Sequence, residues 1–398
     1  AKRKTTLTPA PKAKPAAKKA IAKVTKPAKV AKVAKPAKVA KVARAAKPAR
    51  AAKPAKLAAP SAEQLEFLAS IIANPDDKRA RLVYADLLQD QGDPRGELIA
   101  LQCARVELPE GDPWIAELEA REAELFKAYK KAWTTFGDTP GARWEFRRGF
   151  VEKLSMDAEP LLAAAALIFA AEPIEELNVW KIPKSTVVID GSRLAPILAL
   201  PLGNIRRLSL ARGELTPADL EALATATTLG NVELLDLSNT ELQADGAAIL
   251  ARATSLPKLR ELRVGTCFLG DDGIAALAAS KTLRFTQLVA SRNEISALGA
   301  ASIATATWAP TLTHLDLSTN DLYDEGLAAL AGSPHLTALR SLKLEYNGFG
   351  DAAADSVLAS TTLASLEHLD LSSNLSGADV ERVRAVFGDR LHMRYDRH

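Results

Sequence analysis

A short leucine-rich phrase returns at a nearly constant step through the second half of this chain. Apolar residues fill the first, fourth and sixth positions of most copies, whose first positions are Ile205, Val232, Leu259, Phe285, Leu312, Leu339 and Leu366. The step is 27 residues, with one step of 26 between the third and fourth copies. Self-similarity at a fixed period in the twenties predicts a stack of repeated structural units.

Each copy joins a strand pattern to a helix pattern. The alternation at its start has the period of a β-strand, and its Ala/Leu-rich second half predicts a helix. A mostly polar column follows each strand, at Gly213, Thr240, Cys267, Asn293, Asn320, Asn347 and Asn374. We expect the Asn side chains of this column, and more weakly those of Thr240 and Cys267, to turn inward and satisfy backbone groups that the turn leaves unpaired.

The array resembles the leucine-rich repeat family, and its period is similar to that of the ribonuclease-inhibitor-like subclass. The resemblance runs from a degenerate first copy at Ile174 to Asn374. It implies an α/β solenoid, a horseshoe with a concave parallel sheet and convex helices that holds a protein partner. Strands stack about 4.8 Å apart whereas helices are about 10 Å across, so the strands are expected on the inside of the curve.

The overall charge of +4 conceals a division of the chain into a cationic and an acidic part. Residues 1–60 contain 19 Lys or Arg and no acid, which leaves 33 basic and 48 acidic residues in 61–398. A cation stands at every third position, at Lys23, Lys26, Lys29, Lys32, Lys35, Lys38, Lys41, Arg44, Lys47, Arg50, Lys53 and Lys56. The interspersed prolines and the lack of aromatic residues predict a disordered tail.

A polycation of this kind favours sequence-independent binding to nucleic acid through phosphates. The tail is similar in composition to the Lys/Ala/Pro-rich tails of linker histones and of some bacterial nucleoid proteins. Nucleic acid is the interpretation we favour. The alternatives are an anionic membrane, a polymer or the acidic array of the same chain as the tail's partner, or a simple solubilising linker.

Residues 61–148 carry the signals of four helices, including a Ser61/Gln64 capping box and a proline after an aspartate at two later starts. Residues 82–99 resemble the short repeat-companion domain that precedes repeat arrays in myxobacterial and planctomycete proteins, a family without an established activity. Its polar residues form either a site or a set of caps and salt bridges, and we favour the second: Tyr84, Asp86, Asp90, Asp93, Arg95 and Glu97.

We therefore divide the chain into a disordered cationic tail (1–60), a helical companion module (61–148) and a solenoid with end caps (149–398). Alternation over residues 147–154 predicts one strand that covers the open edge of the first repeat. At the other end Val380, Val383 and Val386 predict a closing helix, and a last strand is expected from Leu391.

Side chains between the strand leucines should face the concave side. Arg and aromatic residues anchor interfaces most often. The candidate partner-binding residues are Trp180, Arg206, Arg207, Asp236, Arg263, Arg292, His314, Asp316, Lys343, Tyr346 and Asp370.

No sequence signature of catalysis is apparent. His314 and His368 each precede an aspartate by two residues on one strand face, but no nucleophile or third ligand is placed consistently with them. The sequence therefore predicts a non-enzymatic binding protein without cofactor or metal. An alternative is a GTPase-activating type of regulator, a role that some ribonuclease-inhibitor-like arrays have.

Two distant cysteines, Cys103 and Cys267, provide no disulfide framework, and no apolar run has the length of a membrane span. These features predict a cytoplasmic protein, and the tail suggests association with a bacterial nucleoid.

Overall fold

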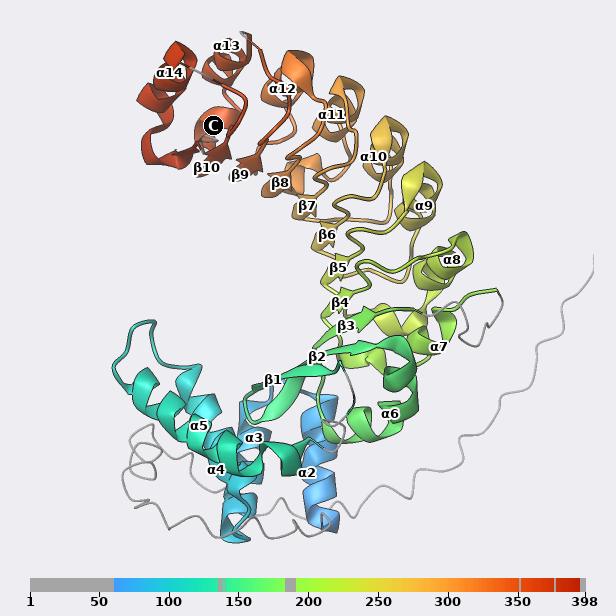
Figure 1. The fold of residues 1–398 in the computed structure, drawn as a ribbon, viewed down its shortest axis with the longest axis vertical. Coiled ribbons are helices and arrows are strands. Elements are labelled where there is room, and N and C mark those ends of the chain that lie inside the picture. Colours follow the sequence, from blue (N-terminus) through green and yellow to red (C-terminus); the bar gives the residue numbers. More distant parts are fainter. Residues whose placement is uncertain are drawn as a thin grey trace, which may run out of the picture. The chain divides into compact units, whose positions relative to one another are not determined.

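One β-sheet, built mainly from parallel strands, runs through the repeat array and organises the fold (Figure 1). The computed structural model describes residues 61–134, 139, 141–182, 191–350, 352–375 and 377–393. They belong to one unit, Arg50–His398. The predicted tail, with all of its candidate nucleic-acid-binding cations, lies outside the described residues.

Four helices come first, and their starts follow the predicted capping chemistry. They are α2 (Ala62–Ala73), α3 (Lys78–Asp90), α4 (Pro94–Arg105) and α5 (Trp114–Trp133). The Ser61 hydroxyl accepts a hydrogen bond from the Gln64 N–H at 3.2 Å, and the Gln64 side chain accepts one from the Ser61 N–H at 2.7 Å. This reciprocal pair is the predicted capping box.

The array then alternates strands with helices. Its strands are β1 (Arg143–Arg147), β2 (Phe150–Asp157), β3 (Glu176–Trp180), β4 (Arg207–Ser209), β5 (Leu234–Asp236), β6 (Glu261–Arg263), β7 (Gln287–Val289), β8 (His314–Asp316), β9 (Ser341–Lys343), β10 (His368–Asp370) and β11 (Leu391–His392). Its helices are α6 (Ala158–Ala171), α7 (Ala195–Leu198), α8 (Pro217–Thr225), α9 (Gln243–Ala251), α10 (Gly270–Ala278), α11 (Ala297–Ala304), α12 (Tyr323–Ala331), α13 (Ala352–Ala359) and α14 (Gly377–Phe387).

The register of the sheet follows the leucine repeat. Strands pair in chain order, and every pair from β2 onward is parallel. From β3 onward the leucine of each strand aligns with that of the next, along Leu177, Leu208, Leu235, Leu262, Leu288, Leu315, Leu342, Leu369 and Leu391. The α/β leucine-rich-repeat solenoid predicted from the period is confirmed.

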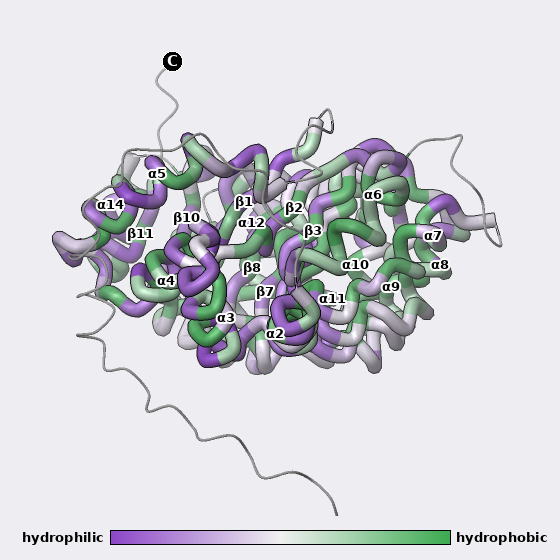
Figure 2. Tube along the Cα trace, turned by 90° about the horizontal axis from the view of Figure 1, so that it is seen from below, coloured by the Kyte–Doolittle hydropathy of each residue, from purple (hydrophilic) through white to green (hydrophobic). Residues whose placement is uncertain are grey.

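The array bends with the strands inside and the helices outside (Figure 1), as the difference between strand and helix spacing requires. Polar and apolar segments alternate along the chain in Figure 2, because each element buries only one side. The apolar core is continuous with the helical module, since Leu98 and Leu125 belong to the same cluster as the repeat leucines.

Side-chain amides complete the turns that follow the strands. The Asn320 carbonyl oxygen accepts hydrogen bonds from the N–H groups of Asn293 and Ile295, at 2.9 and 3.1 Å. Its amide nitrogen donates to the carbonyls of Ala290 and Leu317, at 3.1 and 2.9 Å. One buried side chain thus satisfies four backbone groups drawn from two repeats, as expected for this column.

Two earlier positions in this column use a different chemistry. The Cys267 thiol donates to the Leu237 carbonyl at 3.1 Å, and the Thr240 hydroxyl donates to the same oxygen at 2.7 Å. Both side chains are buried. They can replace the donor function of Asn but reach fewer backbone groups.

The N-terminal cap differs from the predicted single strand over residues 147–154, which is wrong. Strands β1 and β2 pair antiparallel there, and the chain reverses at Arg148 and Gly149 with φ values of 50° and 86°. A Cβ on Gly149 would lie 2.1 Å from Cγ1 of Ile99, so the turn needs both left-handed backbone and space. The expected boundary between 148 and 149 falls inside this turn, and the three-part division remains a prediction.

The far end of the array is closed by α14 and β11, as expected. Val380 and Val383 are buried, whereas Val386 is 56% exposed and does not join them. Strand β11 pairs parallel with β10 through Leu391 and His392.

The hydrogen-bond ladder of the turns generates a stability prediction. Asn320→Ala leaves three backbone groups unpaired, because the Leu317 carbonyl still accepts from the Asn347 amide at 3.0 Å. It is expected to lower the free energy of unfolding by about 3 kcal/mol. Asn231→Ala removes the same side chain from an exposed site and should cost under about 1 kcal/mol. Urea unfolding of both variants measures the difference. Equal losses would show that the ladder does not carry this stability.

Candidate binding face

The concave side of the sheet presents two rows of side chains, one on each side of the buried middle leucines. The first row contains Arg207, Leu234, Glu261, Gln287, His314, Ser341 and His368. The second row contains Ser209, Asp236, Arg263, Val289, Asp316, Lys343 and Asp370. Strand alternation places both rows on the face opposite the core.

Seven of the candidate partner-binding residues lie in these rows: Arg207, Asp236, Arg263, His314, Asp316, Lys343 and Asp370. Two more, Arg292 and Tyr346, lie in the turns after β7 and β9 and are exposed, with φ values of 57° and 53°. Trp180 ends β3, and the Arg143 guanidinium lies 5.3 Å from the centre of its ring. The structure therefore brings most of these candidates onto one face or its rim.

Three of the row carboxylates also stabilise the ends of their strands. The Oδ1 atoms of Asp236, Asp316 and Asp370 each accept a hydrogen bond at 3.0 Å from the N–H of a serine two residues later, at Ser238, Ser318 and Ser372. This local bond holds the turn. The paired His-x-Asp positions are thus accounted for by backbone geometry.

The basic residues of the rows are more exposed than the acids beside them. Arg263 is 41% exposed and donates through Nε to Glu261 at 2.6 Å, whereas Glu261 is 15% exposed. Arg207 is 49% exposed and lies 4.0 Å from Glu176. Lys343 on β9 is also exposed. A partner that meets this face therefore contacts guanidinium and ammonium groups first.

Two histidines meet at the C-terminal end of the face. The rings of His368 and His392 lie 3.9 Å apart between centroids. Burial, together with His392, lowers the pKa of His368 below its ordinary value, although Asp370 acts in the opposite direction. His368 is therefore neutral at pH 7 and adds an aromatic polar group rather than a charge.

The described residues offer no reactive thiol or metal site. Burial raises the pKa of Cys103 to about 11 and also raises that of Cys267. Groups of His, Cys, Asp or Glu suited to a metal ion are absent from this part of the chain. Nor does any described helix combine the length and apolar character needed to cross a bilayer.

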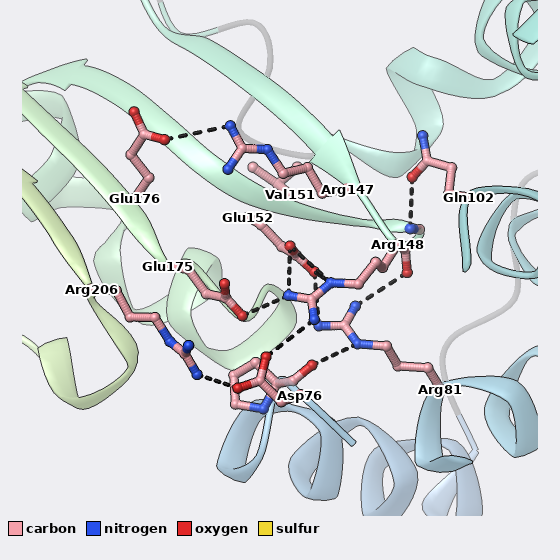
Figure 3. Close-up of polar contacts among 12 residues, drawn as sticks. Asp76, Arg81, Gln102, Arg147, Arg148, Val151, Glu152, Glu175, Glu176 and Arg206 are labelled. Carbon is pink, nitrogen blue, oxygen red and sulfur yellow. Dashed lines mark hydrogen bonds and ion pairs between the residues drawn. The ribbon is translucent and has the colours of Figure 1, made fainter. Parts of the chain in front are cut away.

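Arg206, the remaining candidate, points instead to a junction between the helical module and the first strands (Figure 3). Its guanidinium pairs with Asp76, which follows α2. Asp76 also accepts from Arg148 at 3.3 Å, and Arg148 binds Glu152 and Glu175 at 2.8 and 2.7 Å. Arg148 thus links the module to β2 and to the residue that precedes β3.

Beneath this network lies a fully buried pair. Arg81 of α3 is 0% exposed and binds Glu152 of β2, itself 2% exposed, at 2.8 Å. Its other nitrogens donate to the carbonyls of Pro75 and Arg148, at 2.9 and 3.2 Å. Each guanidinium nitrogen therefore has one carboxylate or carbonyl oxygen near it, which offsets part of the cost of burial.

Three of the six polar residues in the set within 82–99 have structural partners, which supports caps and salt bridges for those three. Arg95 binds both carboxylate oxygens of the buried Glu172, at 2.8 and 2.9 Å. Glu97 pairs with Arg121 at 2.7 Å, and Asp93 caps α4. The partners lie 24 to 77 residues away in sequence, so no local signal pointed to them.

Comparison with known proteins agrees with the repeats. The family model described as Leucine Rich repeat matches residues 255–278 and 309–331. No curated protein matches the sequence. The chain carries leucine-rich repeats, a scaffold typical of protein–protein interaction.

Two similar solved structures illustrate the comparison. An internalin, InlF of Listeria monocytogenes, has 19% identity and a TM-score of 0.36, with 60% of this chain and 56% of that chain covered. The yeast Rad7 and Elc1 complex has 14% identity and a TM-score of 0.34, with 83% and 91% covered. The chain spans little more than half of the internalin.

The buried pair at the junction generates a second prediction. Arg81→Met leaves Glu152 buried with one cation fewer and should lower the free energy of unfolding by about 3–5 kcal/mol. Arg81→Met combined with Glu152→Gln should cost about 2 kcal/mol less than the sum of the two single changes. Calorimetry or urea unfolding of the four proteins gives this coupling.

A matched control uses an exposed pair. Arg252 and Glu221 also form an ion pair but are 58% and 47% exposed. Arg252→Met should therefore cost under about 1 kcal/mol. A loss at Arg81 no larger than at Arg252 would contradict the structural role of the junction.

Proposed function

We propose that this protein is a non-enzymatic scaffold that holds a protein partner on its concave face and nucleic acid on its cationic tail. The observation that carries the first half is the continuous sheet, whose two rows of side chains are at least partly exposed except at Leu234. Eight strand spacings separate β2 from β10, which is roughly 40 Å at about 4.8 Å each. A surface of that length suits a folded partner better than a small metabolite.

The chemistry of the rows supports recognition by charge and shape. Cations such as Arg207, Arg263 and Lys343 project further than the acids between them. Arginine and aromatic side chains contribute most to interface energies, and Trp180 and Tyr346 lie at the margins of the same face. A partner with acidic protrusions fits this arrangement.

The tail supports the second half of the proposal through its charge. Its 19 cations and absence of acids favour binding to a phosphate backbone irrespective of sequence. Joined in one chain, tail and face would raise the local concentration of the bound partner near nucleic acid. The period close to that of ribonuclease-inhibitor-like arrays, the companion-like module and the histone-like tail would together describe a nucleoid-associated bacterial protein.

Photo-crosslinking tests the concave face. Benzoylphenylalanine in place of Lys343 is expected to crosslink a partner protein in an extract of the source cells, because this position lies in the second row. The same group in place of Ala301, exposed on the convex helix α11, should yield no such product. Arg263→Glu should reduce the Lys343 product several-fold. Identical products from both positions would argue against the face.

The tail is tested by nucleic-acid affinity against salt. Replacing its twelve regularly spaced cations by Gln in the full chain should weaken binding at low salt by about a hundredfold or more and flatten the salt dependence. A control with the same tail composition in scrambled order keeps the charge and should bind almost normally. Fluorescence anisotropy with labelled DNA and RNA measures both. Unchanged binding after neutralisation would exclude the tail as the nucleic-acid element.

A further inference from the structure

At the edge where the turns lead into the helices, two sequence columns are acidic, with one apolar exception each, through the four repeats that begin at Val232, Leu259, Phe285 and Leu312. Outside these four repeats the columns also hold Ala218, Gly348, Ala352 and Leu375. The position after the turn column holds Glu214, Glu241, Phe268, Glu294 and Asp321 in successive repeats. Four positions later the residues from the second of these repeats onward are Asp245, Asp272, Leu298 and Glu325. All nine are exposed. Phe268 and Leu298 therefore replace acids at two neighbouring places.

The two apolar residues line one recess of about 690 Å³. Phe268 is 54% exposed and Leu298 is 72% exposed. Asp271 and Asp272, at the start of α10, are the acidic residues that line the recess. Two exposed apolar side chains with acidic residues beside them are thus open to solvent on an edge distinct from the concave rows.

Folding does not explain Phe268. Its φ of 56° is in the left-handed region, as is that of Glu294 in the next repeat at 57°, whereas Glu214, Glu241 and Asp321 at the same column do not have a positive φ. Bulky side chains are disfavoured there, and Asn or Gly would fit better. A half-exposed ring recovers little of that cost by burial.

Nor does folding explain Leu298. It lies in the first turn of α11, where an acidic residue would interact favourably with the helix dipole, as Asp272 does in α10 and Glu325 in α12. Its 72% exposure leaves little apolar area buried. Phe268 and Leu298 are thus each less favourable for local stability than the alternatives, and each adds exposed apolar surface.

The two acids that line the recess differ in their hydrogen bonding. Asp271 accepts hydrogen bonds from the N–H groups of Ser296 and Gly299, at 2.8 and 2.9 Å, and so caps the next helix. Asp272 is exposed in the first turn of α10 and remains available to a ligand. Glu241 and Glu294 flank Phe268 in the neighbouring repeats.

We propose that this recess docks a cationic segment of a partner protein. An aliphatic side chain of the segment packs against Phe268 and Leu298, and its Lys or Arg residues lie against Asp272, Glu241 and Glu294. Charge complementarity favours a cationic segment over other occupants, because an acidic or neutral apolar segment would place no positive charge near the flanking carboxylates. A cation over the face of Phe268 adds a further attraction. The recess would be a second docking surface, independent of the concave face.

The test uses the full chain and a short fluorescein-labelled peptide in which one Leu is flanked on each side by Lys-Arg pairs. Fluorescence anisotropy should show salt-sensitive binding. Phe268→Asn combined with Leu298→Ala should weaken it by about tenfold or more, as loss of an aromatic anchor does. The same variant should keep its thermal midpoint, because neither side chain stabilises the fold.

Matched controls separate this site from general attraction to an acidic protein. Leu167→Ala, which shortens an exposed leucine on α6, should leave peptide affinity unchanged. Asp272→Asn with Glu294→Gln should weaken binding and reduce its dependence on salt. A peptide with Ser in place of Leu should bind about tenfold more weakly.

Three results would overturn the proposal. The first is equal affinity of the Leu and Ser peptides, or of the wild-type protein and the Phe268→Asn/Leu298→Ala variant. The second is a clear fall in the thermal midpoint of that variant, which would make both residues structural. The third is self-association in sedimentation experiments that this variant abolishes, which would assign the recess to a second copy of the chain.

Discussion

Hydrogen bonds from buried side-chain amides to the backbone of adjacent repeats hold this array in register. The leucine core is apolar and non-directional, so by itself it would tolerate sliding of one unit against the next. Asn320 removes that freedom, because its amide meets backbone groups on both sides of its own turn at 2.9 to 3.1 Å. Where Cys267 and Thr240 take this position, a thiol and a hydroxyl supply a donor but fewer bonds. The curvature and both side-chain rows follow from units fixed in this way.

Ion pairs fix the helical module against the first strands of the array, whereas amide hydrogen bonds connect the later repeats. Arg148 binds carboxylates from the helical module and from β2, while Arg81 carries one guanidinium into a site closed to solvent. Because a buried charge is tolerated only with complete hydrogen bonding, this geometry specifies one orientation of module and sheet. Burial of the shared apolar cluster stabilises the contact between module and sheet, and the ion pairs determine their relative orientation.

Local periodicity was sufficient to predict the strands, the helices and the inward Asn column from sequence, because those features repeat at a fixed step. The hairpin at Gly149 was missed, since its cause is the approach of Ile99, which has no local signature. Arg206 was expected among the binding residues, yet its partner Asp76 is 130 residues earlier. Phe268 and Leu298, by contrast, could have been found by aligning the repeats, because each is the one apolar residue of its column through four successive repeats.

The two ends of the sheet are closed very unequally. At the start, β1 and β2 are five and eight residues long, and the helices continue the core beneath them. At the finish, β11 contributes two residues. In a linear array each unit is supported only by its neighbours, so transient opening begins where that support is least. Thermal fraying should therefore travel from α14 toward the middle, making the histidine end of the concave face the first part of the described sheet to open.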